Sequence, residues 1–214
     1  PGHSHAPATF DRAFGIGIAL NAAFVIAEAG YGLRAHSLSL VADAGHNLGD
    51  VLGLVLAWAA SVLARRAPSA RRTYGMRRGS ILAAVGNAAI LLAAMAVIAW
   101  EAVHRFANPA PVATTTVMVV AAVGIVINSV TALGFMSGRH GDLNVRGAYL
   151  HMVGDAAISA GVVVAGLVIR LSGWQWMDPA VSLVLVVLVV ASTWGLLRDS
   201  VNLAMDAVPA SIDP

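Results

Sequence analysis

The stretch ADAGHNLGD, residues 42–50, places two aspartates and a histidine inside a run that otherwise has the length and composition of a membrane-spanning helix. A second stretch, LHMVGDAAIS, residues 150–159, does the same further along the chain. Each contains the spacing HxxxD: His46 with Asp50, and His151 with Asp155. Residues four apart share one face of an α-helix, about 6 Å apart along its axis. Each helix therefore offers an imidazole and a carboxylate to the same point.

The composition is that of a membrane protein. The 214 residues are 58% hydrophobic and only 11% charged, with a mean hydropathy of +0.79. Soluble domains carry about a quarter charged residues, so a soluble protein is excluded. The chain has no cysteine, which excludes disulfides and thiolate metal sites.

Six apolar runs are long enough to cross a bilayer, for which about 20 residues are needed. They are residues 14–33, 40–63, 80–100, 114–136, 148–171 and 179–197. We predict an all-α protein, a polytopic six-helix transmembrane bundle. The transport domain is expected over residues 14–200, between an N-terminal tail, 1–13, and a C-terminal tail, 201–214. The N-terminal tail does not have the pattern of a cleavable signal peptide.

Arginine orients the predicted bundle, because cytoplasmic loops are enriched in basic residues. All 13 basic residues are arginine. Ten lie on one side of the bundle: Arg12, Arg65, Arg66, Arg71, Arg72, Arg77, Arg78, Arg139, Arg146 and Arg198. Both termini belong to that side and are expected in the cytoplasm. This topology also explains the pI near 9.7 without a nucleic-acid partner.

Polar residues within the spans are costly, at about 2.5–3.5 kcal/mol for a mid-membrane charge. They are Glu28, Asp43, His46, Asn47, Asp50, Asn87, Asn128, His151 and Asp155. We interpret the asparagines as hydrogen-bonding residues between helices. Glu28 is either a structural partner or an acid lining a cavity.

The two HxxxD pairs together predict a metal site. Asp50 and Asp155 are expected at similar depth near the midplane, on helices that run in opposite directions, where transporter sites occur. Two neutral histidines and two carboxylates carry a charge of −2, which a divalent cation neutralises. Four nitrogen and oxygen ligands suit zinc. Cobalt and nickel fit this ligand set better than calcium or magnesium do.

Protons compete for the same ligand atoms, because histidine and carboxylate must be deprotonated to bind a metal. Histidine, with an ordinary pKa near 6.5, titrates in the useful range. A site loaded from the cytoplasm and emptied toward a more acidic exterior would exchange metal for protons. The sequence therefore predicts a metal/proton antiporter with alternating access.

For other groups near the motifs, the sequence leaves two interpretations open. Asp43 either hydrogen-bonds a ligand histidine or forms a salt bridge or cap nearer the outer interface. Gly45, Gly49 and Gly53 form a stripe that favours close approach of another helix. Two further histidine groups are weaker metal candidates, for which a flexible tail and a solvated loop are the simpler interpretations: His3 with His5, and His140 with Asp142.

The residues 37–58, SLSLVADAGHNLGDVLGLVLAW, together with 142–166, DLNVRGAYLHMVGDAAISAGVVVAG, resemble the cation diffusion facilitator family, and within it the zinc-transporting branch. The resemblance covers all six spans, including RRTYGMRRGSILAA at 71–84 and LLRDSVNLAMDAVP at 196–209. It implies that His46, Asp50, His151 and Asp155 are the transport-site ligands. It further implies a homodimer that exchanges cytoplasmic zinc for protons and tolerates cobalt, nickel or some cadmium. A bacterial inner membrane is the expected location.

The sequence departs from that family in three places. It ends at Pro214, without the cytoplasmic ferredoxin-like domain that members usually carry, so it is either a shortened form or a member lacking that domain. The second loop has no histidine or acid for the additional metal site of some relatives. The fourth loop lacks a long histidine-rich run.

Two other functional classes fit the sequence less well. An intramembrane metalloenzyme requires an open metal position and a general base, as in HExxH, and the chain contains no such motif. A passive channel requires several weak sites along a pore rather than one tight site. We therefore expect a transporter and not an enzyme.

Overall fold

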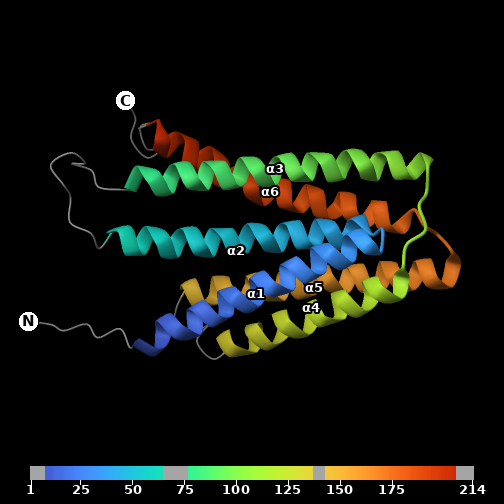
Figure 1. Ribbon diagram of the computed structural model, residues 1–214, viewed down its shortest axis with the longest axis horizontal. Helices are drawn as coiled ribbons and strands as arrows, with labels where there is room; N and C mark the ends of the chain where they lie inside the picture. The colour runs from blue at the N-terminus through green and yellow to red at the C-terminus, as the bar shows by residue number, and fades with distance from the viewer. Residues whose placement is uncertain (1–7, 65–76, 137–142, 206–214) are drawn as a thin grey trace, which may run out of the picture.

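The computed structural model describes residues 8–64, 77–136 and 143–205, and its regular structure there is entirely helical. The helices are α1 (Ala8–Arg34), α2 (Leu38–Ala64), α3 (Arg77–Ala107), α4 (Thr114–Phe135), α5 (Leu143–Ser172) and α6 (Met177–Ala204) (Figure 1). The predicted all-α bundle of six helices is confirmed.

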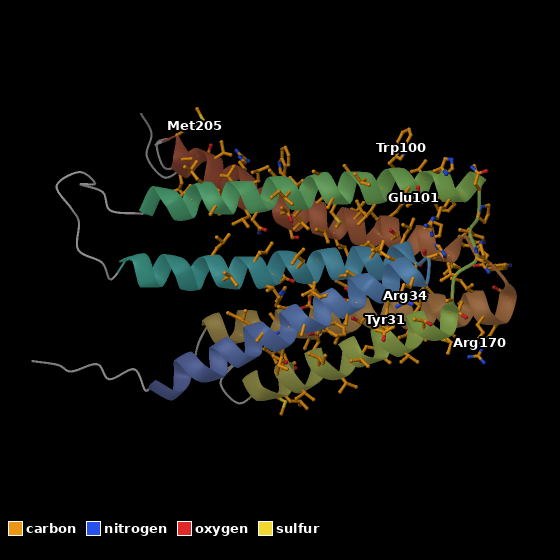
Figure 2. All side chains as sticks on the ribbon, in the orientation of Figure 1. Tyr31, Arg34, Trp100, Glu101, Arg170 and Met205 are labelled. Atoms are coloured by element: carbon orange, nitrogen blue, oxygen red, sulfur yellow. The ribbon has the colours of Figure 1, made fainter. Side chains whose placement is uncertain are left out.

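Successive helices run in opposite directions, so α1 begins and α6 ends at the same end of the bundle (Figure 1). We call this the arginine-rich end, because Arg78, Arg146 and Arg198 belong to the helix segments there. The opposite end, where α2 and α6 begin, is called the packed end. Arg34 and Arg170 lie near the packed end (Figure 2).

The helices have the lengths that a membrane requires. Four of the described helical segments are long and apolar enough to cross it: Ile81–Ala107, Thr114–Gly134, Arg146–Ser172 and Met177–Ala204. Helices α1 and α2 are 27 residues long each, about 40 Å at 1.5 Å per residue.

Several helices extend beyond the predicted apolar runs. Helix α3 continues to Ala107, α6 continues to Ala204, and α1 already begins at Ala8. The physical reason is that a helix does not end where the hydrocarbon does. The polar interfacial layers extend the bilayer to about 40–45 Å, and hydrogen-bonded backbone remains favourable there.

The hydrophobic core occupies the packed half of the bundle. Helix α4 packs along α5 and α3 along α6, while α2 contacts α1, α3, α5 and α6. The core contains residues from the first part of α2, α4 and α6 and the last part of α3 and α5: Leu40, Ala42, Met95, Ile98, Val117, Ala121, Val162, Leu185, Val186 and Val189. This packing holds α2 and α5 together beside the HxxxD motifs.

A buried aspartate joins α6 to the start of α2. Asp178, which is 1% exposed, accepts hydrogen bonds from the hydroxyl groups of Ser37 and Ser39, both at 2.6 Å. It also accepts from the backbone amides of Leu38 at 2.7 Å and Ser39 at 3.2 Å. These amides belong to the first turn of α2, where intrahelical partners are lacking. Asp178 therefore caps α2 from another helix, a role that the sequence did not indicate.

Replacing Asp178 with alanine is expected to destabilise the protein by about 3 kcal/mol or more, because it leaves buried hydroxyl and amide donors without an acceptor. The measurement is the unfolding midpoint of the detergent-solubilised protein. Asp199→Ala, at an exposed position of the same helix, is the matched control and should leave the midpoint unchanged. An equal effect of both changes would contradict the capping role.

Candidate metal centre

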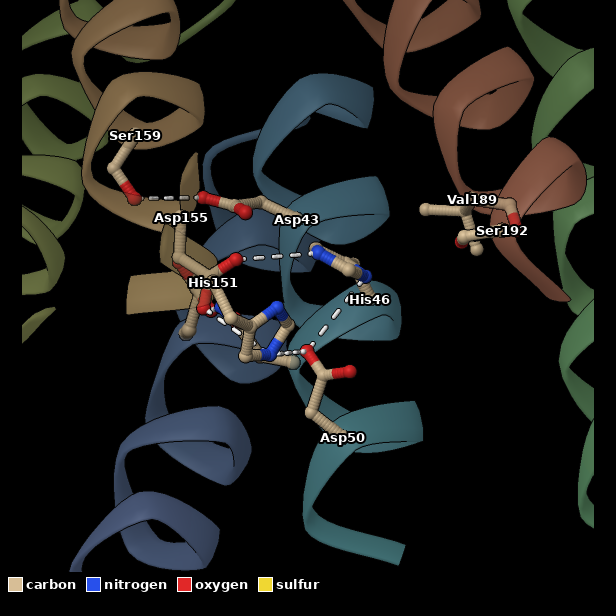
Figure 3. Close-up of polar contacts among 10 residues, drawn as sticks. Asp43, His46, Asp50, His151, Asp155, Ser159, Val189 and Ser192 are labelled. Atoms are coloured by element: carbon tan, nitrogen blue, oxygen red, sulfur yellow. Dashed lines mark hydrogen bonds and ion pairs between the residues drawn. The ribbon is translucent and has the colours of Figure 1, made fainter. Parts of the chain in front are cut away.

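Helices α2 and α5 bring the two HxxxD motifs together. His46 and Asp50 lie near the middle of α2, and His151 and Asp155 lie on the facing side of α5 (Figure 3). The helical spacing of four residues places the members of each pair on one face. The four side chains that the sequence predicted as ligands thus meet between two antiparallel helices.

The nitrogen and oxygen atoms of the four residues alternate around the centre. His46 Nδ1 lies 3.7 Å from Asp50 Oδ2, and His46 Nε2 lies 3.4 Å from Asp155 Oδ1. His151 Nε2 lies 3.4 Å from Asp50 Oδ2 and 3.6 Å from Asp155 Oδ2. Each histidine therefore contacts both carboxylates, one from its own helix and one from the other.

These separations suit a tetrahedral ion. Ligand atoms about 2.0–2.1 Å from zinc lie about 3.3 Å from one another. One ligand atom each from His46, Asp50 and Asp155 fall within 4.8 Å of one another. Asp50 Oδ2 faces both histidines yet is inaccessible to solvent and lacks a hydrogen-bond donor. An inaccessible carboxylate oxygen beside two imidazoles is a suitable ligand for a cation.

His46 differs from His151 in how it faces the carboxylates. His151 presents Nε2 to both, whereas His46 presents Nδ1 to one and Nε2 to the other. The two rings are nearly perpendicular, with an interplanar angle of 86° and centroids 6.1 Å apart. A metal ion takes one nitrogen from each histidine. Only one of the two His46 nitrogens can therefore serve as a ligand, whereas Nε2 of His151 faces both carboxylates.

Exposure of the four side chains reveals the direction in which the centre opens. His151 is 42% exposed and Asp50 33%, whereas His46 is 16% and Asp155 5% exposed. Asp50 follows His46 along α2, and His151 precedes Asp155 along α5. Both exposed ligands consequently lie on the side of the arginine-rich end. The centre opens toward that end and is closed toward the packed end.

The hydrogen bonds of Asp43 and Glu28 test the two interpretations given for each residue. Asp43 accepts a hydrogen bond from Ser159 on α5 at 3.2 Å, so its hydrogen-bonding partner is not a ligand histidine, and it is neither a cap nor an interfacial salt bridge. Glu28 is fully buried and accepts a hydrogen bond from Asn47 at 3.0 Å. Asn47 thus joins α2 to α1, as predicted for the intramembrane asparagines, and Glu28 is a buried partner.

The glycine stripe of α2 faces α3 and not the partner helix of the centre. A Cβ at Gly45 would lie 2.7 Å from Met95 Cε, and one at Gly49 would lie 2.7 Å from Leu91 Cδ2. Nothing lies within 4 Å of a Cβ at Gly53. The stripe therefore permits close approach of α3 behind the ligand face, at two of its three positions.

Alanine at Gly45 and Gly53 should have different effects on stability. Both changes gain helix propensity, about 1 kcal/mol, but only the Gly45 change forces the Met95 side chain to move. Gly53→Ala is expected to be about 1 kcal/mol more stable than Gly45→Ala. Unfolding midpoints of the two variants measure the difference. Equal stabilisation would show that α3 does not pack on Gly45.

Some predicted features lie outside the described residues. They are the His3 and His5 group, the His140 with Asp142 group, and the loop arginines Arg65, Arg66, Arg71, Arg72 and Arg139. Three further arginines, Arg34, Arg105 and Arg170, lie in the helix segments at the packed end. Arg105 donates to the backbone carbonyl of His36 at 2.5 Å and pairs with Glu101 at 2.9 Å. His36 is thus at the packed end.

Comparison with known proteins agrees with this architecture. Residues 15–203 match the family model of the cation efflux transmembrane domain. The chain is 38% identical to the cation efflux system protein CzcD of Alcaligenes sp., over 99% of this chain and 67% of the relative. It is 37% identical to the cadmium, cobalt and zinc/H(+)-K(+) antiporter of Bacillus subtilis, over 99% of this chain and 69% of the relative.

A third relative is the zinc transporter ZitB of Escherichia coli, which is 40% identical over 94% of this chain and 63% of that protein. The chain thus spans about two thirds of the length of these relatives. The region matched by the family model contains α2 to α5, most of α1 and α6, and both HxxxD motifs, as the resemblance to the cation diffusion facilitators predicted. This chain belongs to the cation efflux family, with residues 15–203 forming the family's transmembrane domain.

Proposed function

We propose that this protein exports zinc and that His46, Asp50, His151 and Asp155 bind the ion during transport. The observation that carries the proposal is the meeting of two imidazoles and two carboxylates between α2 and α5. Nitrogen and oxygen donors in this number favour zinc over calcium or magnesium. Transport rather than catalysis is proposed, because four side chains leave no open metal position for a substrate.

The substrate range is proposed from the ligand set and from the relatives. Relatives are named for zinc alone or for cadmium, cobalt and zinc. Imidazole with carboxylate also accommodates nickel, although zinc matches the four-coordinate geometry better. We therefore expect zinc as the main substrate, with cobalt, cadmium and nickel as weaker ones.

The proposed direction of transport follows from the arginine distribution. The arginine-rich end is assigned to the cytoplasm, with both tails, residues 1–13 and 201–214, on that side of the transport domain, 14–200. The exposed ligands Asp50 and His151 face that end, so zinc enters from the cytoplasm. Because the hydrophobic core closes the packed end, release outside requires a rearrangement of α2 and α5 relative to their neighbours.

Protons are proposed as the counter-ion. Zinc binding displaces protons from histidine and carboxylate, and a more acidic exterior returns them and releases the metal. The name of the Bacillus subtilis relative includes H(+) among its exchanged ions. The protein is expected to work as a homodimer in a bacterial inner membrane, a location supported by its bacterial relatives.

The test is flux in proteoliposomes that contain the purified protein and a zinc-sensitive dye. With the lumen made acidic, zinc entry should accelerate, and the lumen should become less acidic in proportion to the zinc that enters. The control is the same experiment with a proton ionophore, which should remove the acceleration. Zinc flux that is indifferent to the pH gradient would instead support a channel.

A further inference from the structure

Two acidic side chains lie behind the metal centre, on the side of the packed end. Glu28 of α1 is 0% exposed and Asp43 of α2 is 1% exposed. Asn47, which hydrogen-bonds Glu28, lies one helical turn after Asp43 on the same face of α2, and this places the two carboxyl groups side by side. Asn47 donates to Glu28 Oε2. Ser159 donates to Asp43 Oδ2 (Figure 3). Three helices therefore enclose a pair of carboxyl groups with no solvent contact.

Each acid retains one oxygen without a hydrogen-bond donor. These atoms, Glu28 Oε1 and Asp43 Oδ1, are both inaccessible to solvent. Buried carboxylate oxygens normally receive donors, because an unpaired ionised oxygen in an apolar interior is strongly unfavourable. A bound proton or a cation would satisfy both oxygens.

Within the described helices, permanent positive charges lie away from the pair: α2 contains no arginine, and the arginines of α1, α3, α5 and α6 lie toward the ends of those helices. The titratable side chains one helical turn from Asp43 and from Ser159 are His46 and Asp155. Helix α4 contains no titratable residue, and the charged residues of α3 and α6 lie toward the ends of those helices. Two carboxylates in contact in a low-dielectric interior cannot both be ionised without a compensating charge. One proton shared by the pair removes this repulsion.

We propose that Glu28 and Asp43 form a proton-binding site of the antiport, separate from the metal ligands. The pair holds one proton while the metal centre is free of zinc. His46 lies one helical turn from Asp43 on α2, and Asp155 lies one turn from its donor Ser159 on α5. Arrival of a divalent cation at His46 and Asp155 therefore provides the nearby positive charge that lets the pair ionise. The released proton then goes to solvent at the open, arginine-rich end. This inference rests on the proposed function, because it assumes zinc binding at the four-residue centre.

The arrangement makes zinc and proton binding mutually exclusive through charge. Shared ligands alone would exchange metal for the protons of the histidines. A pair behind the centre adds one further proton to each transport cycle. Because the pair is enclosed by α1, α2 and α5, access to its proton changes when these helices rearrange.

Glu28→Gln tests the site with little change of shape. The amide of glutamine keeps a hydrogen-bond acceptor for Asn47 but does not titrate. Zinc chloride is titrated into the detergent-solubilised full chain by calorimetry at pH 7, in buffers of different ionisation enthalpy, to count protons released per zinc. We expect the variant to release about one proton fewer, and the slope of log affinity against pH to fall by about one.

Two further variants keep the test decisive. Asp43→Asn should cause the same loss, and the double variant should lose no more than either single one, because the pair shares one proton. Glu101→Gln, which changes an acid at the packed end that is paired with Arg105, is the matched control and should release as many protons as wild type. Infrared difference spectra of wild type should lose a protonated-carboxyl band when zinc is added, and Glu28→Gln should not.

The outcomes separate this inference from the proposed function. If wild type binds no zinc, the proposed function fails. If all proteins bind zinc and Glu28→Gln and Asp43→Asn release as many protons as wild type, the separate proton site is refuted while zinc binding stands. If wild type binds two zinc ions and either variant binds only one, the pair is a metal site and the proton assignment is wrong.

Discussion

Replacing His151 with alanine is expected to abolish zinc transport while leaving the protein folded. His151 contacts both carboxylates of the centre through Nε2, at 3.4 Å and 3.6 Å. Its removal takes away one of four ligands, and changes to residues that only support a ligand already cost about 10–100-fold in metal affinity. We therefore expect a loss of zinc affinity of more than about 100-fold. Because His151 is 42% exposed, little packing is lost with it.

The measurement combines zinc flux in proteoliposomes with zinc binding in detergent. His104→Ala is the matched control, since His104 is an exposed histidine at the packed end of α3 and contacts Asn108. It should transport at the wild-type rate. Retained flux in His151→Ala, with an unfolding midpoint equal to that of wild type, would exclude His151 from the site.

A second histidine removal should add little to the first. Once His151→Ala has disrupted the four-ligand shell, His46→Ala has no complete site to damage. The two changes act on one centre, and contacting residues of one site are not additive. The double variant is expected to lose about as much zinc affinity as either single one. Losses that multiply would indicate that the two histidines bind separate ions.

Acidification is expected to weaken zinc binding about 100-fold between pH 7.5 and pH 5.5. The sign follows from competition, because each histidine must be neutral to bind the ion and is increasingly protonated below its ordinary pKa near 6.5. Over this interval, protonation of each of the two histidines lowers the zinc affinity about tenfold. Protons held elsewhere, such as by Glu28 and Asp43, would steepen the dependence.

Zinc titrations of the purified protein across this pH interval measure the effect. His151→Ala provides an internal comparison, because the zinc affinity of a site with one histidine should fall only about tenfold over the same pH interval. A zinc affinity independent of pH would contradict binding by histidine and would remove the physical basis of proton exchange.

The meeting of the four candidate ligands could be predicted from the sequence because the spacing within each motif is local. His46 and Asp50 share a face of any helix that contains them, and the same holds for His151 and Asp155. Repetition of the motif at similar depth in two antiparallel spans was the only signal needed to expect them together. The structure agrees, with every histidine of the centre near both carboxylates.

The roles of the neighbouring polar residues could not be predicted in the same way. Asp43 shares a helix face with His46, and this pattern is compatible with a hydrogen bond between Asp43 and a ligand histidine. Its hydrogen-bond donor instead comes from α5, as Ser159. Asp178 carried no signal at all, although it caps α2 across a sequence separation of about 140 residues. These contacts depend on which helices are neighbours.

By itself, the amino-acid sequence determined the six helices, the family and the four candidate ligands. Helix formation, membrane insertion and HxxxD spacing depend on residues close in the chain, and these leave a periodic apolar pattern. Only the tertiary structure decided that Gly45 packs on α3, that Asp178 holds the start of α2, and that the centre opens toward the arginine-rich end. It also decided that Glu28 and Asp43 are both buried behind the centre, because burial and contact between distant helices follow from packing, which no local pattern encodes.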